Sequence, residues 1–327
     1  MIKEILFTHD DMDGAGCRIV YELMHANQKK NEDYELFNCS NKGLDDKVIE
    51  VLNDSSFAEC THYVFADICP KHDTLLALKE HNIDVEIFDH HVSALESKPE
   101  EVFPYIKIII TKNGIKQSGT SLLYEHYMMG IDFMEDNICK IFNNKQFELL
   151  VDTIRSYDTY EWKETNNITA KQLQTLFFLL GMDNFCDKYI NEIISYGNIE
   201  NGLFSEMEMK FIETKIQQEQ SIIDSFTPDD GFAFDWNGNK TLLLLGTKGA
   251  NISELGYQFL HKFPEYDIIV CYYAASGEFS LRTLKDEIRI DLMCTNLGGG
   301  GHTRAAGFTL DQKSQDKIIN IIKDAFK

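Results

Sequence analysis

The sequence predicts an α/β fold: a doubly wound, mainly parallel sheet, then a helical linker and a second, smaller α/β domain. Three observations predict it. Strand-like and helix-like stretches alternate in the first third of the chain, a mostly helical stretch follows, and strand-like segments return near residue 230. The 327 residues are about twice the length of a usual single domain, which also favours two domains.

The first domain is predicted from three short apolar strands, at residues 4–8, 62–66 and 85–88. Helical patterns follow the first two strands, from Ala15 and from about Lys71. Acidic and histidine residues come directly after each apolar run. In doubly wound sheets ligands gather at the carboxyl ends of the strands, so these polar residues lie where such a fold places its sites.

The rest of the chain is predicted to bridge to a second domain. Residues 117–225 are mostly helical, and apolar residues in 206–225 are spaced for one face of a long exposed helix. A polar turn at 228–231 then precedes further strands at 241–245, 266–273 and 278–282. We therefore expect domains at residues 1–165 and 231–327, joined by a helical connecting region at 166–230.

Composition limits the classes of partner. The net charge of −22 disfavours binding to long duplex nucleic acid, which needs a basic surface, so a nucleotide enzyme of this charge needs bound cations and small substrates. The chain has no long apolar run and no signal-peptide pattern, so we expect a cytoplasmic protein without membrane contact. Eight scattered cysteines without a CxxC pair indicate neither a zinc ribbon nor a disulfide framework.

Candidate metal ligands follow the first strand at alternate positions: His9, Asp11 and Asp13. Imidazole with several carboxylates is a nitrogen and oxygen ligand set that suits Mn²⁺ or a similar ion and lacks the thiolates of structural zinc sites. Gly14 and Gly16 let the backbone turn closely into the next helix. The alternative interpretation of this segment alone is a solvated acidic turn that caps a helix.

Two further strands end in residues of the same kind. The strand at 62–66 leads into Asp67, and the strand at 85–88 leads into Asp89, His90 and His91. One such ending is common, because Asp often caps the next helix. Three strand ends of this type are hard to explain by capping, and they favour a metal site.

With these residues the sequence resembles the DHH phosphoesterases, a superfamily that includes RecJ exonucleases, family II inorganic pyrophosphatases and nanoRNases. Asp89-His90-His91 matches the motif that names the family. The first motif at residues 9–14, with the segments 118–124 and 157–162, most resembles the nanoRNase B branch. The similarity runs over nearly the whole chain.

The resemblance implies two Mn²⁺ ions, with Mg²⁺ or Co²⁺ as alternatives. It implies ligand roles for His9, Asp11 and Asp67 at one ion, and for Asp13, Asp67, His90 and Asp158 at the other. Asp67 would bridge the ions, His91 would face the scissile phosphate, and Asp89 would orient the paired histidines. Asp152 is the alternative to Asp158. Two such cations activate a water and polarise phosphoryl oxygens, so no protein nucleophile is needed.

The second domain carries a glycine run at 298–301, followed by an imidazole and a guanidinium group. Backbone amides in such a run can surround a phosphate, although a plain loop is the alternative interpretation. The strand around Arg282 and the helix that opens at 251–256 resemble the DHH-associated domain. By this resemblance the substrate-binding candidates are Arg282, Gly299, Gly300, Gly301, His302 and Arg304.

The expected function is hydrolysis of short oligoribonucleotides from the 3′ end to mononucleotides. Other substrates compatible with the same centre are 3′-phosphoadenosine 5′-phosphate, cyclic or linear signalling dinucleotides, and polyphosphate. A nucleotide sensor without catalysis is the alternative from another class. It is disfavoured because all six candidate metal positions hold side chains that can bind metal.

Overall fold

The computed structural model describes residues 2–196, 199, 202–245, 252–273, 277–311 and 313–317, and the structural statements below concern these residues. The chain forms two compact units, Met1–Ile212 and Glu213–Lys327, called unit 1 and unit 2. Among the described helices, none combines the length and the apolar character needed to cross a bilayer.

Unit 1 is built on a five-stranded sheet of order β2-β1-β3-β4-β5. Each neighbouring pair in it is parallel. The strands are β1 (Glu4–His9), β2 (Tyr34–Cys39), β3 (His62–Ala66), β4 (Asp84–Asp89) and β5 (Tyr105–Ile108). Because all five strands run in the same direction, their carboxyl ends meet at one edge of the sheet.

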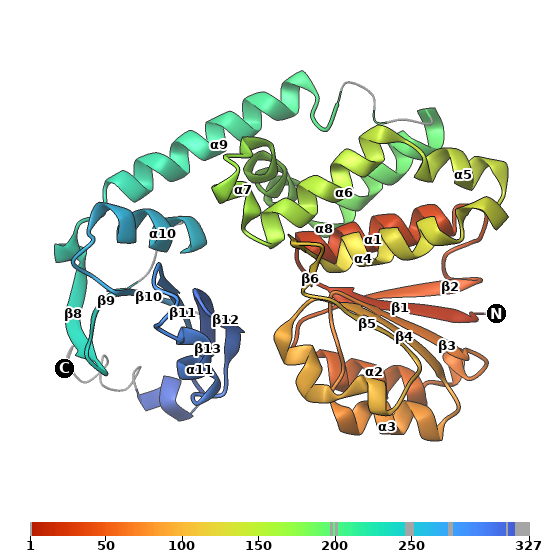
Figure 1. The fold of residues 1–327 in the computed structure, drawn as a ribbon, viewed down its shortest axis with the longest axis horizontal. Coiled ribbons are helices and arrows are strands. Elements are labelled where there is room, and N and C mark those ends of the chain that lie inside the picture. The colour runs from red at the N-terminus through yellow and green to blue at the C-terminus, as the bar shows by residue number, and fades with distance from the viewer. Residues whose placement is uncertain are drawn as a thin grey trace. The chain divides into compact units, whose positions relative to one another are not determined.

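Helices cover both faces of this sheet (Figure 1). α1 (Met12–Met24) and α4 (Gly119–Met129) lie on one face, and α2 (Leu44–Asn53) and α3 (His72–Glu80) lie on the other. Short 3₁₀ helices occupy Ser55–Phe57, Val92–Ser97, Pro99–Glu101 and Ile131–Phe133. A two-stranded hairpin, β6 (Thr111–Lys112) with β7 (Ile115–Lys116), precedes α4.

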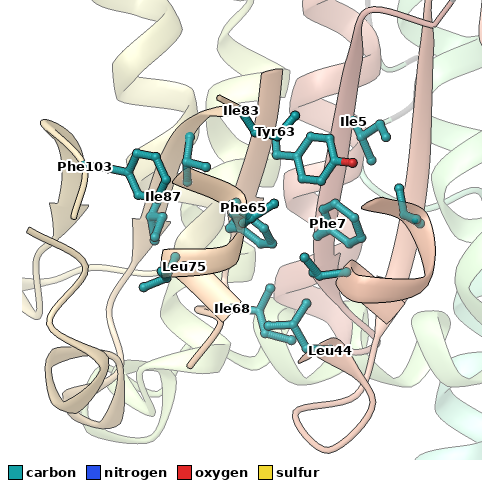
Figure 2. Close-up of a cluster of buried hydrophobic side chains, with 14 of the residues drawn as sticks. Ile5, Phe7, Leu44, Tyr63, Phe65, Ile68, Leu75, Ile83, Ile87 and Phe103 are labelled. Carbon is teal, nitrogen blue, oxygen red and sulfur yellow. The ribbon is translucent and has the colours of Figure 1, made fainter. Parts of the chain in front are cut away.

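The core beneath α2 and α3 consists of side chains that alternate along the central strands (Figure 2). Phe7 and Phe65 stack across β1 and β3 with ring centroids 5.1 Å apart, and both are fully buried. Leu75 of α3 packs into the same cluster. Burying such side chains stabilises each by about 1.5–3 kcal/mol, which makes the central strands a rigid base for the residues that follow them.

The remainder of unit 1 is helical. Its helices are α5 (Asp136–Phe142), α6 (Lys145–Asp158), α7 (Glu161–Glu164), α8 (Ile168–Tyr196) and the start of α9 (Glu206–Asp224). α8 packs against α1 and α6 and is interrupted at Gly181, whose φ is +73°. The boundary between the two compact units falls inside α9, between residues 212 and 213.

Unit 2 contains a six-stranded sheet of order β12-β13-β11-β10-β9-β8, antiparallel except for the parallel pair β9 and β10. A short 3₁₀ helix, Pro228–Asp230, leads into it. The strands are β8 (Gly231–Trp236), β9 (Asn239–Leu245), β10 (Ile268–Tyr273), β11 (Glu278–Thr283), β12 (Gly300–His302) and β13 (Ala305–Thr309). α10 (Ile252–Lys262) packs on β10 and β11, and α11 (Ile290–Thr295) packs on β12 and β13.

The predicted fold class is confirmed: a parallel α/β sheet, helices after it, and a second sheet domain. The domain boundaries at residues 165 and 230 stay a prediction. The two compact units meet instead between residues 212 and 213, and α8 belongs to unit 1. The strands β2, β5, β6, β7, β8, β12 and β13 were not predicted from the sequence.

Candidate metal centre

The predicted metal ligands lie at the carboxyl edge of the parallel sheet. His9 is the last residue of β1, Asp67 directly follows β3, and Asp89 is the last residue of β4 with His90 directly behind it. These three strands are neighbours in the order β1-β3-β4. The fold therefore brings together side chains that are some eighty residues apart in sequence.

Two elements outside the sheet add carboxylates to this edge. Asp11 is the N-cap of α1, where its side chain accepts the backbone N–H of Gly14 at 3.0 Å. Asp13 lies in the first turn of the same helix and is buried. Asp158 is the last residue of α6. Asp11 thus both caps a helix and belongs to the cluster, two roles that its sequence context alone presents as alternatives.

The side chains form three overlapping groups, and within each group the possible ligand atoms lie within 4.8 Å of one another. Asp67 belongs to two of the groups. His90 also belongs to two, and its Nε2 lies 3.2 Å from Asp67 Oδ1, 3.2 Å from Asp158 Oδ2 and 3.9 Å from Asp13 Oδ2. The groups are His9, Asp11 and Asp67; Asp13, His90 and Asp158; and Asp67, Asp89, His90 and His91.

Asp67 has an unusual backbone and an unusual environment. Its φ of +63° is in the left-handed region, which residues other than glycine rarely adopt, although Asp and Asn do so more readily than most. Its side chain is 1% exposed, and Oδ2 has no hydrogen-bond partner among the described residues. Burial, with the neighbouring carboxylates of Asp13 and Asp11, raises the pKa of Asp67 well above its usual range.

Asp89 holds the histidine pair. Its Oδ1 accepts the backbone N–H groups of His90 and His91 at 2.6 and 2.9 Å and lies 2.8 Å from His91 Nδ1. Although burial opposes ionisation, the hydrogen bond from His91 lowers the pKa of Asp89. Burial also opposes a charged His91, but the bond to Asp89 and other carboxylates raise the pKa of His91 to about 9. Burial and the neighbouring His91 lower the pKa of His90 to about 4.

This donor set fits divalent cations. Five carboxylates and three imidazoles share one partly buried site, and mutual repulsion together with burial raises the pKa of both Asp67 and Asp158. Bound dications would remove this penalty, because they are the largest local charges in such sites. Among the described residues no donor reaches the buried Oδ2 of Asp67, which is an atom that a cation would satisfy. The mixture of imidazole and carboxylate suits Mn²⁺.

The geometry distinguishes Asp158 from Asp152. Asp158 reaches His90, whereas Asp152 is 58% exposed and pairs with Arg155 at 2.7 Å. The structure thus brings Asp158 into the cluster and leaves Asp152 at the surface.

In unit 2, the basic candidates lie around the hairpin of β12 and β13. Ala305 pairs with His302 in one direction and with Arg282 in the other, so these backbones are adjacent in the sheet. Arg304 directly precedes Ala305, and its guanidinium forms a bidentate pair with the exposed Asp286. The side chain of His302 lies outside the described residues, as does Asn251 of the predicted helix opening.

Arg282 is held from two sides. Its Nη1 donates to Ser280 Oγ at 2.9 Å and to the carbonyl of Leu281 at 2.7 Å. A Cβ atom on Gly256 of α10 would lie 2.7 Å from Arg282 Cγ. The lack of a side chain at Gly256 therefore leaves room for the side chain of Arg282 next to α10.

The glycine run has a packing role for two of its members. A Cβ at Gly299 would lie 2.0 Å from the carbonyl oxygen of Gly307, and one at Gly301 would lie 2.6 Å from that of Ala305. Gly300 has nothing within 4 Å of such an atom. Close pairing of β12 with β13 thus requires Gly299 and Gly301 independently of any ligand.

Comparison with known proteins finds relatives that match nearly the whole chain. No family model matches the chain. The chain is 27% identical to oligoribonuclease NrnB of Bacillus subtilis, over 96% of its own length and 74% of that protein. It is 21% identical to a 3′,5′-cyclic-nucleotide phosphodiesterase of Helicobacter pylori, over 95% and 94% of the two chains.

Solved structures agree with these relatives on the fold. The DHH domain of a member of a family of ribosomal proteins superposes with a TM-score of 0.58 at 12% identity, over 100% of this chain and 87% of that one. In sequence the chain resembles nucleotide phosphodiesterases, and in fold it resembles a DHH domain. RecJ of Thermus thermophilus in complex with Mn²⁺ superposes on this chain with a TM-score of 0.53 at 13% identity, over 95% of this chain and 50% of RecJ.

Several residues that shape the candidate metal centre were not among the predicted site residues. Asn41, in the loop after β2, places its amide nitrogen 3.3 Å from His9 Nε2. Gly119 and Thr120 donate their backbone N–H groups to Asp13. In sequence, the segment 118–124 indicates only the family resemblance, because a glycine and a threonine carry no signal of their own for metal chemistry.

Proposed function

We propose that the protein is a DHH-family phosphoesterase and, more narrowly, a Mn²⁺-dependent 3′–5′ exoribonuclease that degrades short oligoribonucleotides to mononucleotides. The observation that carries the proposal is the cluster of imidazoles and carboxylates at the carboxyl edge of the parallel sheet. The similarity to an oligoribonuclease over nearly the whole chain supports the choice of substrate.

The three groups in the cluster support a division into two ion sites. We propose that His9, Asp11 and Asp67 hold one ion, and that Asp13, Asp67, His90 and Asp158 hold the other. Asp67 groups with His9 and Asp11, and its Oδ1 also lies 3.2 Å from Nε2 of His90 in the other set, which supports its assignment as the shared ligand. Two bound dications supply an activated water and offset the charge that develops on the phosphoryl group.

Within the proposal, Asp89 and His91 act as an orienting and a contacting residue. Asp89 fixes His91 through its ring nitrogen and its backbone N–H, so the ring has little freedom to turn. We propose that His91 faces the scissile phosphate. A partly exposed imidazole in this place, 32% accessible, can donate a hydrogen bond to a phosphoryl oxygen.

Substrate binding is proposed for unit 2. The guanidinium groups of Arg282 and Arg304, the imidazole of His302 and the backbone amides of Gly300 and Gly301 are candidates for contacts with nucleotide phosphates. The backbone N–H of Gly299, also predicted to bind substrate, donates instead to the carbonyl of Cys294 at 2.8 Å. Gly298 and Gly300 are the members of the run at which an added Cβ atom would meet no described atom within 4 Å. A protein of net charge −22 repels the distant phosphates of a long strand, so short substrates are favoured.

A panel of substrates tests the proposal. Trinucleotide RNA, long single-stranded RNA, 3′-phosphoadenosine 5′-phosphate, a linear and a cyclic dinucleotide, and polyphosphate are each incubated with the Mn²⁺-loaded protein. The expected result is the fastest release of mononucleotide from the trinucleotide, with 5′-labelled RNA shortening from its 3′ end. Equal rates on short and long RNA would contradict the length preference. Faster hydrolysis of another member of the panel would change the proposed substrate and leave the proposed metal chemistry in place.

A further inference from the structure

The first turn of α4 is joined to the metal centre by its backbone. Ser118 and Ser121 form a capping box: the backbone N–H of Ser118 donates to Ser121 Oγ at 3.0 Å, and that of Ser121 donates to Ser118 Oγ at 3.3 Å. The N–H groups of Gly119 and Thr120 point instead to Asp13, at 2.6 Å to Oδ2 and 3.2 Å to Oδ1. All of these residues are buried, and a carboxylate at a helix N-terminus is favoured by the charge-assisted bonds and by the helix dipole.

Thr120 adds a third bond to the same residue. Its hydroxyl donates to the main-chain carbonyl of Asp13 at 2.7 Å. The side chain fits only because residue 16 is glycine: a Cβ there would lie 2.2 Å from Thr120 Oγ1. Gly16 and Thr120 therefore form one close contact between α1 and α4, next to Asp13.

Gly119 makes an equally close contact with Asp67. A Cβ at position 119 would lie 2.5 Å from Asp67 Cβ and 2.7 Å from its Cα and backbone nitrogen. Asp67 is the residue with a left-handed backbone. Such a conformation persists only where the surroundings enforce it, and the bare backbone of Gly119 allows α4 to pack directly against it.

We propose that Gly119 and Thr120 are positioning residues for the metal centre: together they fix Asp13 and Asp67 in the arrangement that binds the ions. The proposal rests on the metal-binding function proposed above and adds a cause for its geometry. It assigns a role to the segment 118–121 and to Gly16, which the proposed function leaves without one.

The contacts also separate the roles of the two carboxylates. Each carboxylate oxygen has two lone pairs, and Asp13 uses one on each oxygen for α4. Asp13 thus keeps a restricted set of directions for a ligand. Oδ2 of Asp67 has no partner among the described residues and keeps both of its lone pairs. A fixed Asp13 beside an open Asp67 is the arrangement in which Asp67 can serve more than one ion.

The test compares Mn²⁺ affinity between variants, measured by titration calorimetry and by the spin-resonance signal of free Mn²⁺. Thr120→Val keeps the volume and the backbone N–H but removes the hydroxyl, and it should weaken binding by about ten-fold or more. Thr120→Ser restores the hydroxyl and should bind as the wild type does. Gly119→Ala should weaken binding more than Thr120→Val, because it displaces Asp67.

Thr175→Val is the matched control. Thr175 is a buried threonine whose hydroxyl donates to the carbonyl of Lys171 within α8, at 2.9 Å. The change removes the same atoms away from the centre and should leave Mn²⁺ affinity unaltered. If Thr120→Val does not fold by circular dichroism, Thr120→Ala takes its place under the same criteria.

The outcomes separate this inference from the function on which it rests. A wild-type protein that binds no Mn²⁺ would remove the proposed function itself. Wild-type affinity in both Thr120→Val and Gly119→Ala would overturn only the positioning role. An equal loss of affinity in Thr120→Ser or in Thr175→Val would also overturn it, because the effect would then be one of general packing.

Discussion

Oδ1 of Asp89 lies 2.8 Å from Nδ1 of His91 and also accepts the backbone N–H of that residue. One oxygen atom thus fixes both the main chain and the ring of His91. Asp89 is 1% exposed, so water does not compete for these bonds. An imidazole held in this way presents its other edge in one direction, which is the condition for a defined contact with substrate.

The first prediction concerns Asp89→Asn. The amide keeps an acceptor for the backbone but loses the charge that stabilises the imidazolium of His91. We expect kcat to fall by about 10- to 100-fold, as for other residues that orient a metal-site histidine, with Mn²⁺ content close to that of the wild type. Steady-state kinetics and elemental analysis measure the two quantities. Unchanged kcat would remove the orienting role.

The second prediction concerns Asp67→Asn, which suits a left-handed backbone better than Ala does. Burial raises the pKa of Asp67, so its ionised form destabilises the metal-free fold at neutral pH. The variant should therefore have a higher Tm than the wild type without metal, a smaller gain on adding Mn²⁺, and turnover lower by orders of magnitude. A lower Tm without metal would indicate that Asp67 is a structural residue. Near-normal turnover would refute its role as shared ligand.

The third prediction concerns pH and the opposite edge of the sheet, where His62 Nδ1 lies 3.1 Å from Glu4 Oε2. The hydrogen bond to Glu4 raises the pKa of His62 above 6.5. The contribution of His62 to stability is therefore complete below pH 6.5 and is lost as the pH rises through the pKa of His62 in the folded protein. Burial raises the pKa of Glu4, but hydrogen bonds from His62 and Tyr21 outweigh it and lower this pKa below 4.5. The contribution of Glu4 to stability is therefore complete above pH 4.5 and is lost as the pH falls through the folded-state pKa.

His62→Gln should therefore destabilise the metal-free protein most between pH 4.5 and 6.5, by on the order of 1 kcal/mol. The difference in unfolding free energy from the wild type should shrink toward pH 8.5. Urea denaturation at pH 5.5 and 8.5 measures it. A difference that is equal at both values would show that the pair contributes by packing rather than by charge.

The fourth prediction uses the contact between Gly256 and Arg282. Gly256→Ala places a methyl group 2.7 Å from Arg282 Cγ, so the arginine must move. We expect KM to rise several-fold, as it should for Arg282→Ala, with Mn²⁺ content unchanged. Gly43→Ala is the control, because its nearest neighbour would be Ser40 Oγ at an ordinary 3.4 Å. An unchanged KM in both Gly256→Ala and Arg282→Ala would mean that Arg282 does not bind substrate.

Much of unit 1 could be predicted because its signals are local. Buried parallel strands are continuous apolar runs, and β1, β3 and β4 have this pattern with a polar ligand directly after each. Proximity of the ligands then follows from the direction of the strands alone. Asp158 needed the family resemblance, since nothing in a helix end at residue 158 indicates that it meets β4.

The features that were missed depend on partners elsewhere in the chain. β2 and β5 are the edge strands of the sheet and are only partly buried, so their apolar pattern is weak. Gly16 and Gly119 are required by Thr120 and Asp67, which no local pattern relates to them. The sequence predicts a phosphate site at the glycine run. In the structure, close pairing of β12 with β13 is by itself a steric reason for glycine at positions 299 and 301.

The most direct measurement is hydrolysis of a trinucleotide RNA by protein freed of metal with a chelator, then supplied with Mn²⁺ or Ca²⁺. The account predicts no mononucleotide without metal, rapid release with Mn²⁺, and little with Ca²⁺, whose preference for oxygen ligands suits a site with histidines poorly. Asp67→Asn should stay inactive under all three conditions. Full hydrolysis in excess chelator, or no hydrolysis by a protein shown to hold Mn²⁺, would contradict the account.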